Sequence, residues 1–153
     1  MANPLKELDL KINGFQFIQE IPIAAPPAKV WSALLNVGGW FQFDASNKNK
    51  ITLEAWIGGR WIAEFPDNVV SLMGIVTHIE PEKLLRISGQ IGLTHLPVTN
   101  VVIFELQPKS DNKSTLLRLG NRTFGFMDDD VQKRQAGGWS HLLPQLKSLA
   151  EQP

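Results

Sequence analysis

Chemistry in this chain would have to rest on few side chains. The three histidines are His78, His95 and His141, and no two of them have the spacing of metal ligands on one helix or strand. Ser140 directly precedes His141, but adjacent residues on a helix point in different directions, so they do not form a nucleophile–base pair. Cysteine is absent, which excludes thiolate catalysis, disulfides and cysteine zinc sites. We therefore predict no catalytic residue, no metal site and no cofactor, and the sequence favours a protein that is not an enzyme.

Polar side chains on otherwise apolar strand faces are more informative. Four of them fall at inward positions of a period-two pattern: Gln19, Asn100, Asn121 and Thr123. A hairpin that pairs Leu106 with Leu117 places Val102 opposite Asn121 and Asn100 opposite Thr123, so the two asparagines become diagonal neighbours. A buried amide without a partner costs about 1–3 kcal/mol. We expect these amides either to form a structural pair or to orient the polar end of a ligand.

A second set of candidates is apolar and mostly aromatic. Its members lie on inward faces or in a short aromatic segment, and such side chains either pack as plain core or line a cavity. Trp139 and Leu143 stand at i and i+4 on one helix, so they meet the sheet together. With the two asparagines, the predicted ligand-binding set is Trp40, Phe41, Phe43, Trp61, Phe65, Asn100, Phe104, Leu119, Asn121, Trp139, Leu142 and Leu143.

Hydrophobic periodicity predicts the elements that position these residues. Residues 15–23 alternate as a strand. Ala25-Pro26-Pro27 opens a helix, because proline is accepted in the first turn. Gly38-Gly39 ends that helix, and a short aromatic segment follows at residues 40–43.

The remaining chain divides into strands and one long helix. Residues 50–124 alternate almost throughout and contain six strands joined by short turns. Asp128–Asp130 then supplies an N-cap and negative charge for a final helix. A calcium loop is the less simple explanation of these aspartates. Pro144 lies inside the helical pattern and predicts a kink near Ser140.

This order of elements predicts an α+β architecture. Consecutive strands joined by short turns form an antiparallel meander, and its apolar face must be covered. The final helix is the only element long enough to cover it. We predict a β-α-α-β6-α fold, in which a curved antiparallel sheet of seven strands surrounds the C-terminal helix. Residues 1–14 are an N-terminal extension, residues 15–150 form one domain, and a cavity lies between sheet and helix.

Several motifs, weak singly but specific in their order, resemble a known family. They are Ile23-Ala24-Ala25-Pro26 before Val30-Trp31, Gly58-Gly59-Arg60-Trp61, residues 74–81 (GIVTHIEP), residues 102–106, residues 115–119 (TLLRL), and Gly138-Trp139 followed by Leu142-Leu143 and Leu146-Lys147. Residues 15–150 thereby resemble the helix-grip superfamily of START domains and birch-pollen-allergen-like proteins. Within it, they are most similar to the activator of Hsp90 ATPase homologue 1-like family. The resemblance implies the helix-grip fold and an apolar cavity, but no single function. Asn121 stands where several family members carry a histidine, and that departure disfavours acid–base chemistry there.

Composition limits the partners. Lysine plus arginine balances aspartate plus glutamate at 15 each, so no global field attracts nucleic acid or an anionic membrane. No apolar run is long enough to span a bilayer, and we expect a cytoplasmic protein. The expected function is non-catalytic binding of a small apolar molecule, lipid-like or polyketide-like. The alternatives are a protein-interaction module with a chaperone partner and a cyclase-like or hydrolase-like enzyme, and exposed strand edges favour a homodimer.

Overall fold

The computed structural model describes residue 5, residues 7–42 and residues 49–153. Its elements are β1 (Lys11–Ile23), α1 (Pro27–Leu35), the 3-10 turn η1 (Val37–Gly39), β2 (Lys50–Leu53), β3 (Arg60–Phe65), β4 (Val69–Glu80), β5 (Leu84–Gly89), β6 (Val98–Pro108), β7 (Thr115–Met127) and α2 (Val131–Ala150). This order confirms the predicted α+β architecture. Strand β1 begins at Lys11, earlier than Phe15, because the end of β7 offers it pairing partners as far as Met127.

The strands of the described residues belong to one antiparallel sheet of seven strands, in the order β1-β7-β6-β5-β4-β3-β2. Strands β2 to β7 form the predicted meander, and β1 adds to its free edge beside β7. The predicted hairpin register is confirmed: Leu106 pairs with Leu117, and Asn100 pairs with Thr123. Because side chains alternate across a strand, this register fixes which residues face the interior.

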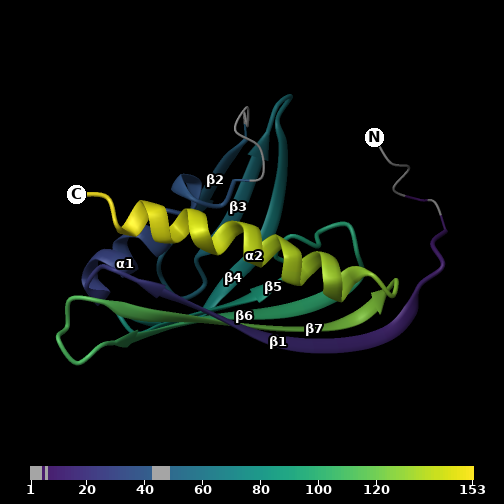
Figure 1. Cartoon of the computed structure of the whole chain (residues 1–153). Helices are drawn as coiled ribbons and strands as arrows, with labels where there is room; N and C mark the ends of the chain where they lie inside the picture. Colours follow the sequence, from purple (N-terminus) through teal and green to yellow (C-terminus); the bar gives the residue numbers. More distant parts are fainter. Residues whose placement is uncertain (1–4, 6, 43–48) are drawn as a thin grey trace.

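Helix α2 lies across the inner face of the sheet. In Figure 1, β1, β7 and β6 run beneath α2, while β2, β3 and part of β4 rise behind it. The buried face of α2 includes Trp139, Leu142 and Leu146, and these side chains belong to one large core cluster with residues of the sheet and of α1. The sheet therefore curves around the helix, as the sequence predicted.

A pair of glycines permits a close approach of strands β4 and β5. Gly74 on β4 is directly opposite Gly89 on β5. A Cβ atom added at Gly89 would lie 2.5 Å from the Gly74 Cα and 2.5 Å from the Met73 carbonyl oxygen. Any side chain there would force the two strands apart, so the close approach requires glycine.

Polar contacts fix both ends of α2. At its start, Asp128 accepts a hydrogen bond from the Asp130 N–H and pairs with Arg134, whereas the Asp130 side chain makes no cap bond. At its end, Lys147 donates to the Pro22 carbonyl and pairs with Glu151. Helix α2 is thereby tied to the end of β1. None of the described helices combines the length and apolarity that a bilayer crossing requires.

Candidate functional site

Aromatic residues from different elements meet at the centre of the molecule. The Phe41 ring centroid lies 5.0 Å from that of Trp61 on β3 and 5.9 Å from that of Trp139 on α2. Trp139 lies 5.8 Å from Phe104 on β6, and Trp40 contacts all of these rings. Most of the pairs meet edge to face, a favoured geometry for aromatic side chains. This part of the predicted ligand-binding set is therefore a packed aromatic cluster.

A cleft opens beside this cluster, between α2 and the loop of residues 90–97 that joins β5 to β6. Its volume is about 260 Å³. We call it the α2 cleft. Phe41, Trp139 and Leu142 from the predicted set line it, and the other lining residues are Ile91, Gly92, Leu93, His95, Arg134, Gln135 and Gly138.

Buried amides hold the loop wall of the cleft. Asn100 accepts a hydrogen bond from the Ile91 N–H at 2.9 Å and donates to the Ile91 carbonyl at 3.3 Å. Gln135 on α2 donates to the same carbonyl at 3.0 Å. Gly92 has a φ of 74°, a conformation that favours glycine, and the chain turns there beside the Gln135 side chain. The loop is thus anchored to both the sheet and the helix.

The side chains of Asn100 and Asn121 bond to different partners. The expected Asn100–Asn121 contact is replaced by separate partners, because Asn100 turns to the Ile91 backbone while Asn121 donates to Thr123 at 3.1 Å. The Asn121 Oδ1 atom and the Trp61 indole N–H are buried without a hydrogen-bond partner among the described residues. A buried polar atom left unpaired costs about 1–3 kcal/mol.

The rest of the predicted set divides by location. Leu119 and Leu143 are buried in the core and do not line the cleft. Phe65 stands at the end of β3 with 37 % of its surface exposed, because the alternating pattern continues beyond the core cluster. Phe43 falls outside the described residues.

Sequence reasoning missed much of the cleft. Ile91, Leu93, Arg134, Gln135 and Gly138 were not predicted as site residues. The signal available for them was the break in strand alternation around His95. The Arg134 side chain, together with the Asp130 N–H, holds the pKa of Asp128 below its ordinary value.

The lining of the cleft is mainly apolar and contains few groups that could react. The buried polar side chains of the described residues are Asn100, Thr115, Asn121, Thr123 and Gln135, and all of them are uncharged. His95 and Arg134 line the cleft but are exposed to solvent. Within the described parts of the chain, no group of histidine, aspartate or glutamate side chains could hold a metal ion. The arrangement can hold an apolar molecule against a lining that also contains the Gln135 amide and the basic Arg134.

Comparison with known families identifies one match. The family model described as Activator of Hsp90 ATPase homolog 1-like protein matches residues 24–151. No curated protein matches the chain.

Solved structures share the fold at low sequence identity. An uncharacterised protein from Rhizobium leguminosarum has a TM-score of 0.73 at 14 % identity, and the alignment covers 94 % of this chain and 99 % of that one. CalU16 from Micromonospora echinospora has a TM-score of 0.61 at 20 % identity, with 94 % and 87 % covered. Norcoclaurine synthase from Thalictrum has a TM-score of 0.60 at 13 % identity, with 92 % and 96 % covered. These similarities show that the chain has the helix-grip fold.

Proposed function

The chain belongs to the Activator of Hsp90 ATPase homolog 1-like family, and from this premise we propose that it binds a small apolar molecule in the α2 cleft without changing it chemically. The observation that carries the proposal is the composition of the cleft wall. Phe41, Trp139 and Leu142 present apolar surface there, backed by the aromatic cluster. A concave, mainly apolar site with a few convergent polar groups is typical of small-molecule binding.

The size of the cleft favours a compact ring system over a long acyl chain. Its volume of about 260 Å³ is below the range of about 300–1,000 Å³ that is usual for small-molecule sites. The edges and faces of Phe41 and Trp139 suit an aromatic guest. Of the two ligand classes expected from the sequence, we therefore favour the polyketide-like one, represented by a fragment of one or two fused rings.

Burial sets the expected affinity. A guest that removes about 150–250 Å² of apolar surface from water, at about 25 cal/mol per Å², gains about 4–6 kcal/mol. This corresponds to dissociation constants from roughly millimolar to tens of micromolar. The Gln135 amide, which lines the cleft, would orient the guest and add little to affinity.

Adjacent glycines on α2 provide a matched test. Gly138 lines the cleft, whereas a Cβ atom at Gly137 would have no atom within 4 Å. Gly138→Leu therefore places a side chain in the cleft, and Gly137→Leu places the same side chain in open space. Both substitutions raise helix propensity by a similar amount. Binding of 1-naphthol and of palmitate is measured by NMR, from the tryptophan indole N–H signals of the intact protein.

We expect 1-naphthol to shift the Trp139 signal in the wild type and in Gly137→Leu, and to bind Gly138→Leu at least about tenfold more weakly. Equal binding to all the proteins would show that the guest lies elsewhere. Palmitate binding that exceeds 1-naphthol binding would overturn the choice of ligand class. Absence of binding by either probe to the wild type would overturn the proposed function.

A further inference from the structure

The face of the sheet opposite α2 carries its own concave surface. Two adjoining hollows of about 510 and about 610 Å³ follow β7 between β1 and β6, and both are lined by Gln16 and Arg122. We call them together the outer groove. Gly120 and Gly14 lower its floor because they have no side chain. Ile18 and Phe124 border it with 64 % and 66 % of their surfaces exposed.

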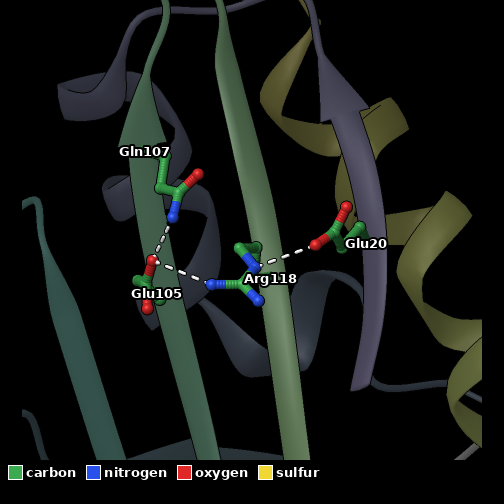
Figure 2. Close-up of polar contacts among 4 residues, drawn as sticks. All are labelled: Glu20, Glu105, Gln107 and Arg118. Carbon is green, nitrogen blue, oxygen red and sulfur yellow. Dashed lines mark hydrogen bonds and ion pairs between the residues drawn. The ribbon is translucent and has the colours of Figure 1, made fainter.

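Charge is distributed unevenly along this groove. Arg118 on β7 pairs with Glu20 on β1 at 2.9 Å and with Glu105 on β6 at 3.5 Å. Figure 2 shows this row across the three strands, with Gln107 also donating to Glu105. Two carboxylates share one guanidinium, so the row has a formal charge of −1. We call it the acidic row.

A basic row lies four residues further along β7. Arg122 is flanked by Gln16 on β1 and Val101 on β6, so its own row has a formal charge of +1. The row between them is apolar and consists of Ile18, Gly120 and Ile103. Successive rows on one face of a strand are roughly 7 Å apart. The groove therefore has an acidic row, an apolar row and a basic row in sequence.

This pattern is complementary to itself after a two-fold rotation. We propose that the outer groove binds a second copy of this chain, with the two sheets face to face. The axis lies in the interface, perpendicular to β7 and level with Gly120. Each basic row then faces the acidic row of the other copy, where Arg122 lies opposite Arg118 and between the flanking carboxylates of Glu20 and Glu105. The apolar rows meet each other, and Phe124 meets Leu116. A closed two-fold dimer requires such a self-complementary surface.

The same two-fold rotation also brings together residues at the margin of the interface. Arg86 on β5 lies level with Ile103, so two copies of it would approach each other. Its guanidinium instead donates to the Thr77 hydroxyl at 3.1 Å, toward β4 and away from the groove. The repulsion at this margin is therefore small beside the two contacts between acidic and basic rows. The sheet face, rather than an exposed strand edge, becomes the predicted surface of the homodimer.

Charge-reversal variants test the proposed two-fold axis as well as the association itself. Arg122→Glu makes both charged rows of that variant −1, and Glu105→Lys makes both rows of that variant +1. Each variant should repel itself, whereas a mixture of the two places opposite charges at both contacts. Lys133→Glu on α2, at the other face of the sheet, is the control with the same charge change as Arg122→Glu. Sedimentation equilibrium measures self-association, and circular dichroism and thermal unfolding verify that each variant is folded.

We expect the wild type and Lys133→Glu to dimerise with the same dissociation constant, and raised salt to weaken the dimer. Each charge variant alone should associate at least about tenfold more weakly, and the equimolar mixture should restore a 1:1 dimer. A wild type that stays monomeric at several hundred micromolar would overturn the proposal and leave the groove open to a different partner. A dimer that persists in Arg122→Glu, or a mixture that fails to associate, would assign the interface to another surface.

Discussion

The two buried asparagines provide a sharp test of how this fold is stabilised. Both side chains are fully buried, and they lie on the neighbouring strands β6 and β7. The Asn100 side chain bonds to the Ile91 backbone through both its amide oxygen and its amide nitrogen, whereas the Oδ1 atom of Asn121 has no partner in the described part of the chain. We therefore predict that Asn100→Leu lowers the free energy of unfolding, whereas Asn121→Leu, the same chemical change, leaves it unchanged or raises it slightly.

The magnitudes follow from the groups that each substitution leaves behind. In Asn100→Leu the buried Ile91 N–H loses its acceptor, which costs about 1–3 kcal/mol, and the lost bonds cost about 1 kcal/mol more. The Ile91 carbonyl keeps a partner, because Gln135 also donates to it. The expected loss is about 2–4 kcal/mol, or roughly 5–15 °C in Tm for a chain of this length.

In Asn121→Leu the orphaned oxygen disappears together with its desolvation cost. The lost bond to Thr123 costs about 0.5–1.5 kcal/mol, which that gain of about 1–3 kcal/mol offsets. The expected result is unchanged or slightly raised stability. Urea unfolding at one low protein concentration measures both free energies. Similar losses in the two variants, or an Asn100→Leu within about 0.5 kcal/mol of the wild type, would refute this account of the amide networks.

Two further predictions concern the close approach of β4 and β5 and the end of α2. Gly89→Ala should destabilise the protein by about 1–3 kcal/mol or more, because the new Cβ atom would lie 2.5 Å from the Gly74 Cα. Gly120→Ala is the control: its Cβ atom would have its nearest neighbour 4.0 Å away, so its Tm in thermal unfolding should stay close to that of the wild type. The Lys147 ammonium and the Ala24 backbone N–H hold the pKa of Glu151 below its ordinary value. The ionised carboxylate therefore stabilises the fold at neutral pH, and this contribution is lost as the pH falls through the ordinary glutamate range and below. The free energy of unfolding, measured from pH 7 to pH 3, should fall more steeply in the wild type than in Glu151→Gln. Identical dependence on pH in the two proteins would contradict this role of Glu151.

Local patterns predicted most of the fold because the sheet is a simple meander. Alternation fixed the inward faces of β6 and β7, and the hairpin loop fixed their register, so the opposition of Asn100 and Thr123 could be read from the chain. The end of β3 shows the limit of that reasoning. Phe65 continues the inward alternation of Trp61 but stands beyond the core cluster, since a period-two pattern does not say where the covering layer ends.

The candidate site was harder to predict, because its walls come from segments far apart in the sequence. Trp139 and Phe41 were accessible to sequence reasoning as large apolar residues on inward faces, and both line the cleft. Gln135 and Ile91 were not, because their roles arise from one hydrogen bond across the helix–loop interface. The apolar interior that the aromatic pattern suggested is largely filled by ring–ring contacts, and the open space lies beside them.

The sequence by itself determined the secondary structure, the strand order and the inward or outward side of most residues, since each depends on periodicity and short connections. Tertiary structure alone decided which inward residues fill the core and which border a cleft, because that depends on how closely α2 approaches the curved sheet. It also decided the partners of the buried amides and the alternation of charge along the outer groove. These properties depend on distances between elements that no local pattern encodes.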